Sequence, residues 1–195
     1  AAWRSDPALI AVVAALSDGD MRPRIVGGAV RDSLLGRAVH DIDLATPLRP
    51  EEVMQRLKAA GLKAVPTGID HGTVTAVADG RTFEVTTLRR DVSTDGRRAT
   101  VAFSDDWRED AARRDFTINA LYADLQTGEI SDYFGGLADL EAQRLRFIGD
   151  ATQRIAEDHL RILRYFRFLA RFGRSEVDGE AYAACQAAAS SLKGL

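Results

Sequence analysis

The first half of the chain alternates between apolar positions at helical spacing and apolar positions at strand spacing, with glycine, proline or acidic residues between them. Apolar residues three and four apart predict a helix, and strict alternation predicts a strand with one buried face. We expect helices at residues 7–16, 30–35 and 50–60. Strands are expected at 24–26, 39–45, 62–65, 73–78 and 82–88, with a turn at Asp79 and Gly80. This order predicts an α+β fold with a small mixed sheet.

The second half changes character at about Gly149. A hairpin is expected from strands at 121–125 and 130–134 around Thr127 and Gly128, and residues 89–99 are expected to form a mobile loop because they contain few apolar side chains. After the change, helices are expected at 152–172 and 179–192. We therefore predict one domain at residues 1–149 and an all-helical one at 150–195.

The bulk composition excludes several classes of protein. The net charge of −3 over 195 residues argues against a globally basic nucleic-acid-binding protein. The single cysteine, Cys185, excludes an internal disulfide and a multi-cysteine zinc site, and we expect it in the core. No apolar run approaches the ~20 residues that span a bilayer. The chain starts without methionine or a signal-like segment, which favours a cytoplasmic protein, cut here from a longer one.

Two motifs in the first half predict phosphate and metal chemistry. Gly27 and Gly28 follow a strand, and glycines let backbone N–H groups approach a phosphate closely. Asp41 and Asp43 alternate on the next strand, so their carboxylates point the same way and repel unless a divalent cation lies between them. Alternating acids also occur on solvated strands, and that alternative stays open.

A third acid, Glu84, lies between apolar neighbours on a strand that we expect to be central. A buried glutamate needs a partner. It would find one in a metal site shared with the two aspartates, or in an ion pair with Arg89 or Arg90.

Residues 113–119, with the sequence RRDFTIN, combine two arginines with an aspartate and an asparagine. Guanidinium groups bind phosphate oxygens and a carboxylate binds hydroxyl groups, so this segment suits a nucleoside triphosphate. The alternative is an arginine-rich helix start that Asp115 caps.

The last motif is the sequence EDHLR at residues 157–161. Asp158 and Arg161 are three residues apart on the expected helix, so an acceptor and a double donor lie side by side. Such a pair matches the edge of cytosine or adenine and mismatches uracil and guanine. An ordinary ion pair on the helix surface is the alternative, as is a solvated face for the arginines that continue from Arg164.

These four segments together resemble the class II CCA-adding enzymes, tRNA nucleotidyltransferases of the polymerase-beta-like superfamily, and the related bacterial poly(A) polymerases. The resemblance covers the chain from Ile25 to about Gly173, in the order of the family's motifs. It implies a polymerase-beta-like nucleotidyltransferase head up to about Gly149, followed by a helical neck. Family members are much longer, so the resemblance also implies a truncated chain with poor tRNA affinity.

The resemblance assigns a role to each candidate residue. Asp41 and Asp43 would be catalytic and hold two magnesium ions, with Glu84 as a supporting carboxylate. Nucleotide binding would fall to Gly27, Gly28, Arg31, Arg114, Asp115, Asn119, Asp158, Arg161 and Arg164. Asp115 would read the ribose 2′-hydroxyl, while Asp158 with Arg161 would select CTP and ATP. The loop at 89–99 matches the family's flexible loop.

The implied reaction adds CCA to the 3′ end of tRNA from CTP and ATP, with release of pyrophosphate. Two other functions stay open. A poly(A) polymerase would keep the fold and the metals but add only A. A non-catalytic nucleotide- or RNA-binding module would keep the fold alone, but it would have no reason to retain a repelling pair of aspartates. We expect no zinc and no membrane partner.

Overall fold

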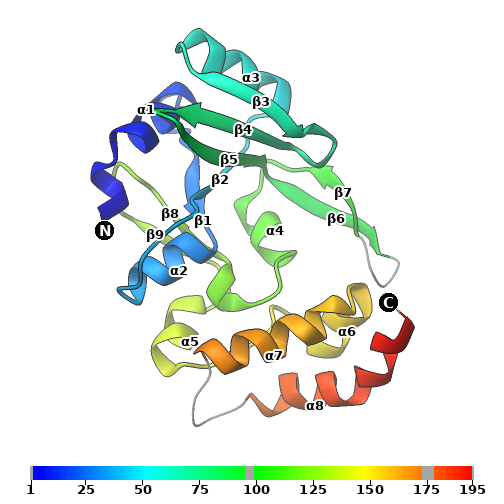
Figure 1. Ribbon diagram of the computed structural model, residues 1–195. Coiled ribbons are helices and arrows are strands. Elements are labelled where there is room, and N and C mark those ends of the chain that lie inside the picture. The colour runs from blue at the N-terminus through cyan, green and yellow to red at the C-terminus, as the bar shows by residue number, and fades with distance from the viewer. Residues whose placement is uncertain (1, 95–98, 173–177, 195) are drawn as a thin grey trace. The chain divides into compact units, whose positions relative to one another are not determined.

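The computed structural model of the chain describes residues 2–94, 99–172 and 178–194 (Figure 1). The chain divides into two compact units. The first contains Ala1–Arg89, Phe103–Trp107 and Tyr122–Ser131, and the second contains Arg90–Ala102, Arg108–Leu121 and Asp132–Leu195. None of the helices in the described part of the chain is both long and apolar enough to cross a membrane.

A mixed sheet of seven strands organises the first unit, as the alternating pattern predicts. Its order is β3-β4-β5-β2-β1-β8-β9. The strands are β1 (Arg24–Val26), β2 (Asp43–Thr46), β3 (Lys63–Gly68), β4 (Thr73–Ala78), β5 (Arg81–Thr87), β8 (Leu121–Ala123) and β9 (Ile130–Asp132). β2 and β5 pair in parallel, whereas β1 pairs antiparallel with both β2 and β8. The strand expected at 39–45 is shorter than predicted, because the ladder begins only at Asp43.

Three helices accompany this sheet: α1 (Pro7–Ala15), α2 (Gly28–Leu34) and α3 (Pro50–Ala59). Asp6 caps α1 through its side chain, which accepts from the backbone N–H groups of Ala8 and Leu9. Short 3₁₀ turns lie at Ala2–Ser5 (η1) and Ile69–His71 (η2). α1 and α3 both pack against β4, whose apolar residues are buried in alternation. The core of this unit therefore lies between the sheet and these two helices.

The predicted loop at residues 89–99 is wrong where the structure describes it. β6 (Arg89–Thr94) and β7 (Ala99–Phe103) pair as a separate two-stranded sheet, and residues 95–98 lie outside the described part. Two paired strands satisfy each other's backbone groups along the edge that they share, and this pairing does not require an apolar face. Arg90, Val92 and Ser93 are accordingly all exposed. A strand of this kind has no apolar face, so a test based on apolar content misses it.

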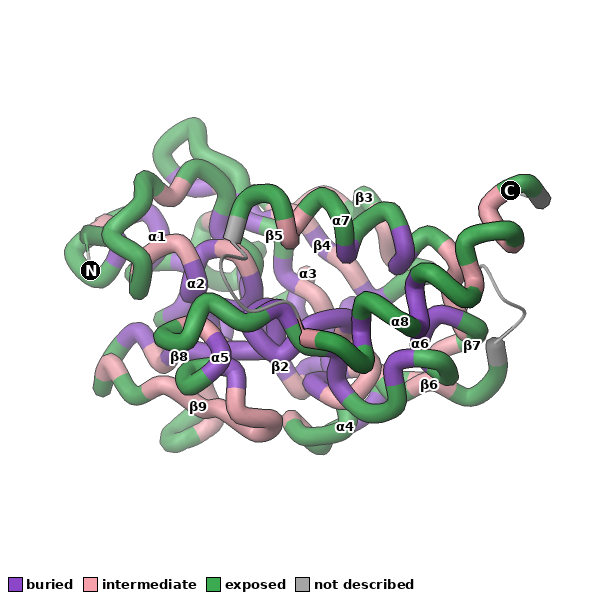
Figure 2. The backbone as a smooth tube through the Cα atoms, turned by 90° about the horizontal axis from the view of Figure 1, so that it is seen from below, coloured by how far each residue is buried: buried purple, intermediate pink, exposed green. Residues whose placement is uncertain are grey.

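Helices form most of the second unit. They are α4 (Trp107–Ala112), η3 (Thr117–Asn119), α5 (Gly136–Ala142), α6 (Ala151–Glu157), α7 (Leu160–Phe172), α8 (Gly179–Ala188) and η4 (Ala189–Gly194). α6, α7 and α8 pack on one another. Along each helix buried residues alternate with exposed ones at helical spacing, so that one side is buried and the other faces solvent (Figure 2).

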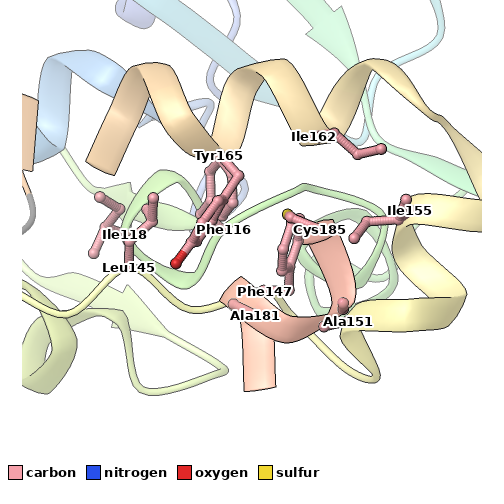
Figure 3. Close-up of a cluster of buried hydrophobic side chains, with 11 residues drawn as sticks. Phe116, Ile118, Leu145, Phe147, Ala151, Ile155, Ile162, Tyr165, Ala181 and Cys185 are labelled. Atoms are coloured by element: carbon pink, nitrogen blue, oxygen red, sulfur yellow. The ribbon is translucent and has the colours of Figure 1, made fainter. Parts of the chain in front are cut away.

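A buried apolar cluster joins these helices to the segment at 113–119 (Figure 3). Phe116 and Ile118 come from that segment, Ile155 from α6 and Tyr165 from α7. Cys185 of α8 is fully buried here, as predicted, and burial raises the pKa of its thiol to about 11. Since two residues of the segment are core residues, the core helps to fix the segment in place.

The single helix expected at 152–172 is two helices. α6 ends at Glu157 and α7 begins at Leu160. Between them Asp158 has an extended backbone, with φ −152° and ψ 105°, and its side chain accepts from the N–H of Leu160. Asp and Asn side chains commonly bind local backbone donors in this way and begin a new helix. The apolar period continues across the break, so periodicity does not reveal it.

Candidate active site

The acidic face of β2 has the alternation that the sequence predicts. Asp41 and Asp43 are exposed, while Ile42 between them is 6% exposed. Asp43 opens β2, and Asp41 lies two residues before it in chain without regular structure. The alternation of burial places both carboxylates on the solvent side and Ile42 on the core side.

Glu84 lies beside this face. It is the register partner of Asp43 in the parallel pairing of β5 with β2, and registered residues of neighbouring strands emerge on the same side of a sheet. Glu84 is exposed, although Phe83 and Val85 on either side are each 1% exposed. The expectation of a buried glutamate is therefore wrong, because β5 buries only its other face.

The predicted ion pair with Arg89 or Arg90 is also not formed among the described residues. Nη1 of Arg89 instead donates to the carbonyl of His71, at 3.2 Å. Glu84 is thus left facing solvent next to Asp43, so a cation or a ligand can reach both carboxylates.

The chemistry of these acids fits a hard divalent cation, which prefers oxygen ligands. Among the described residues, no group of three or more His, Cys, Asp or Glu side chains could hold a metal ion by itself. Magnesium typically binds one or two carboxylates and completes its shell with water and substrate phosphates. The exposed aspartates match that kind of shared site rather than a metal cage made by protein alone.

The glycine turn follows β1 directly. Gly27 has φ +74°, a conformation that favours glycine, and its carbonyl accepts from the N–H groups of Val30 and Arg31. Arg31 is 6% exposed, and its Nε donates to Oδ1 of Asp32 at 3.0 Å. A Cβ added at Gly28 would lie 3.2 Å from Nη2 of Arg31. The turn thus keeps a guanidinium close over a bare stretch of backbone, an arrangement that suits an anion.

Asp115 is the centre of a second set of predicted residues, within the second unit. It is 8% exposed, and its Oδ1 accepts from the N–H of Phe116 at 2.7 Å and from Nδ2 of Asn119 at 3.2 Å. Its Oδ2 accepts from Nε of Arg164 at 2.6 Å, and Nη2 of Arg164 lies 2.5 Å away. The structure therefore brings Asp115, Asn119 and Arg164 together. Asp115 does not cap an α-helix, since the next element is the 3₁₀ turn η3.

Arg114 is held at both its side chain and its backbone. Its Nη2 donates to Oδ2 of Asp110, which is 2% exposed, at 3.1 Å. Its carbonyl accepts from Nη2 of Arg154 at 2.7 Å.

The N–H of Arg161 donates to the carbonyl of Asp158 at 3.1 Å, but no ion pair forms between their side chains among the described residues. Asp158 lies in the break between α6 and α7 and not within the helix of Arg161, and the reading of a base edge by these two side chains stays a prediction. Arg161 is 9% exposed. Its Nη1 donates to Oε2 of Glu157 at 3.0 Å and to the carbonyl of Arg154 at 2.6 Å.

Glu157 and Arg154 hold this second set of residues together, and neither is among the predicted site residues. Glu157 accepts from both Arg154 and Arg161, and Arg154 is 8% exposed. Burial, followed by the nearby Arg161 guanidinium, lowers the pKa of Arg154. Glu157 could have been predicted from the sequence, because it lies four residues before Arg161, a spacing that favours an ion pair on a helix. A buried Arg154 has no such signal, because arginine is usually exposed.

Comparison with known proteins places these features in one family. A family model described as the poly A polymerase head domain matches residues 23–146. The chain is 47% identical over 173 residues to mitochondrial CCA tRNA nucleotidyltransferase 1 of Mus musculus. The aligned region covers 88% of this chain and 39% of the relative. It is 50% identical over 147 residues to a CCA-adding enzyme of Streptococcus pyogenes, covering 74% of this chain and 35% of the relative.

The solved structures agree with these relatives. The crystal structure of the Bacillus stearothermophilus CCA-adding enzyme in complex with CTP matches with a TM-score of 0.78 and 37% identity, over 91% of this chain and 42% of that one. The Thermotoga maritima CCA-adding enzyme complexed with tRNA matches with a TM-score of 0.75 and 29% identity, over 96% of this chain and 43% of that one. The predicted fold class and family resemblance are confirmed, and the chain spans about two fifths of the length of these proteins.

Proposed function

Because the chain belongs to the poly(A) polymerase head-domain family, among whose members are CCA-adding enzymes, we propose that it carries out template-independent nucleotidyl transfer to the 3′ end of tRNA. In this proposal CTP and ATP are the substrates and pyrophosphate is the leaving group. The names of the curated relatives support this reading over poly(A) synthesis. Most of each relative lies outside this chain's match, so the activity needs a direct test.

One observation carries the proposal: Asp41, Asp43 and Glu84 are all exposed, although apolar neighbours beside them are buried. Side chains that only stabilise a fold do not need to place like charges side by side, since such charges repel. A site for cations and phosphate does need them. The glycine turn at Gly27 and Gly28 adds backbone suited to the triphosphate, and Arg31 adds a guanidinium.

Divalent metal is typical of nucleotidyltransferases in this family, and we propose magnesium here. Asp41 and Asp43 would hold it, supported by Glu84. When bound, divalent metal lowers the pKa of a hydroxyl nucleophile and neutralises charge on a departing pyrophosphate. The chain's own contribution is to hold the acids at fixed positions at the start of β2 and on β5, and to orient the triphosphate at the glycine turn.

For the nucleoside we propose binding by Arg114, Asp115, Asn119, Asp158, Arg161 and Arg164, with Asp115 reading the ribose 2′-hydroxyl. An ionised carboxylate accepts about four hydrogen bonds. Phe116 and Asn119 each supply one donor to Asp115, and Arg164 supplies two nitrogen atoms. A ribose hydroxyl would therefore have to displace one of these donors. Base selection by Asp158 and Arg161 would require these two side chains to move from the partners described above.

The same proposal gives each of the two expected domains its own role. Residues 1–149 would form the catalytic head and residues 150–195 the base-recognising neck. We also propose a cytoplasmic location. Some of the matched relatives are mitochondrial proteins, so cell fractionation is the direct test.

The decisive assay supplies tRNA that lacks its 3′ CCA, magnesium and one nucleotide at a time. CTP alone should add two residues, and ATP should then add one. Addition of A without C would favour the poly(A) polymerase. Failure to add any nucleotide, while CTP still binds, would favour the non-catalytic module.

A further inference from the structure

Arg154 of α6 is a buried cation whose guanidinium group donates to two acceptors, a backbone carbonyl and a carboxylate. It is 8% exposed. Its Nη2 donates to the carbonyl of Arg114 at 2.7 Å, and its Nη1 donates to Oε2 of Glu157 at 2.7 Å. The rigid fork of a guanidinium can satisfy two acceptors in this way at fixed separation, and no other side chain reproduces it.

Arg161 of α7 makes the matching contact one residue earlier in the segment. Its Nη2 donates to the carbonyl of Arg113 at 3.3 Å, and its Nη1 shares Oε2 of Glu157 with Arg154. Two consecutive carbonyls, those of residues 113 and 114, are thus held by two guanidinium groups that one carboxylate connects. The residue that follows these carbonyls is Asp115.

Stability alone does not explain Arg154. Its Nε is buried and has no hydrogen-bond partner among the described residues. One carboxylate also serves two guanidinium groups within this contact. Burying a charge with an unsatisfied donor is costly, and apolar residues often fill such a position at lower cost.

We propose that Arg154 is a positioning residue for the nucleotide. It fixes the backbone at residue 114, and through it the carboxylate of Asp115, at the place where that carboxylate meets the ribose. This inference rests on the proposed function of Asp115. Arg154 need not touch the nucleotide, since a small displacement of the segment would be enough to weaken ribose recognition.

The test compares Arg154→Lys with Ile155→Val. A lysine ammonium keeps the charge but lacks the planar fork that reaches both the Arg114 carbonyl and Glu157. Ile155 is the next residue of α6, is 1% exposed, and contributes to the apolar cluster. Its shortening loosens the same helix without touching either carbonyl. Arg154→Gln is made in parallel, so that the conclusion does not depend on one variant folding.

The readout is the preference for CTP over 2′-deoxy-CTP, as a ratio of kcat/KM values, with circular dichroism melts of each variant. For Arg154→Lys and Arg154→Gln we expect this preference to fall about 10-fold, through the KM for CTP more than through kcat. Ile155→Val should keep the wild-type preference even if its melting temperature is lower. An unchanged preference in the Arg154 variants would overturn the inference.

The two proposals fail in different ways. If the unmodified chain does not prefer CTP over its deoxy form, or binds neither, the proposed function of Asp115 fails. If the unmodified chain shows the preference and all three variants lose it equally, general loosening of the helix is the cause, and the role of Arg154 fails alone.

Discussion

Removing the hydroxyl of Tyr165 should make the protein more stable. Tyr165 is fully buried, and its ring lies 5.8 Å from that of Phe147 in a stacked arrangement and 6.3 Å from that of Phe116. Its hydroxyl has no hydrogen-bond partner among the described residues. Tyr165→Phe keeps the ring and these contacts and deletes only the unsatisfied oxygen.

The magnitude follows from two opposing contributions. A buried polar group without a partner costs about 1–3 kcal/mol. The space that one oxygen leaves, about 10 Å³, would cost about 0.2 kcal/mol at the rate measured for core cavities. We therefore expect Tyr165→Phe to raise the free energy of unfolding by about 1–2.5 kcal/mol. At 2–4 °C per kcal/mol for a chain of this size, the melting temperature should rise by about 2–10 °C.

Urea unfolding and thermal melts measure this change. Tyr182→Phe is the matched control because Tyr182 is 43% exposed, so water can hydrate its hydroxyl, and we expect little change there. A clear loss of stability in Tyr165→Phe would contradict this expectation. It would mean that the hydroxyl has a partner, such as a buried water molecule, whose hydrogen bond outweighs the cost of burial.

Three further predictions concern the second unit, which contains Tyr165. Gly136→Ala should destabilise it by about 1–3 kcal/mol, because the new Cβ would lie 2.2 Å from the Thr117 carbonyl oxygen, whereas Gly179→Ala, with nothing within 4 Å, should be neutral in the same urea titration. Burial raises the pKa of Cys185 to about 11 and that of Tyr165 to about 12, from ordinary values of 9.0 and 10.0. Because the folded chain holds both groups in their neutral form more strongly than the unfolded chain does, their titration leaves the stability unchanged below pH 9 and lowers it as the pH rises through 11 and 12. The urea midpoint should therefore fall over that range, and less in a Cys185→Ala, Tyr165→Phe double variant. At pH 8 the Cys185 thiol should resist a thiol-specific reagent until urea unfolds the chain, and rapid reaction of the folded chain would contradict its burial.

Periodicity predicted the elements that bury one face and missed those whose boundaries depend on polar contacts. The strand at Arg24–Val26 and the helices that begin at Pro7 and Pro50 lie where the apolar pattern and the capping residues put them. The ribbon of β6 and β7 buries little, so its polar composition resembled that of a loop. The break at Asp158 depends on one side-chain hydrogen bond to Leu160, which an apolar period cannot show.

The candidate site shows the same division. The alternation of exposed Asp41, buried Ile42 and exposed Asp43 at the start of β2 follows from extended-chain geometry, and the sequence predicted it correctly. The exposure of Glu84 depends on which face of β5 the helices cover, which is a tertiary property. The contact of Arg161 with the carbonyl of Arg113 brings together residues 48 positions apart, and no local pattern encodes it.

The catalytic role of Asp41 and Asp43 can be measured as magnesium-dependent incorporation of CTP into tRNA lacking its 3′ CCA, by the unmodified chain and by an Asp41→Ala, Asp43→Ala double variant. Asp20→Ala, which removes an exposed acid elsewhere in the same unit, is the control. We expect the double variant to lose incorporation by a factor of about 10² or more while its melting temperature stays near that of the control. Incorporation by the double variant at the rate of the unmodified chain would show that these two carboxylates do not carry the chemistry.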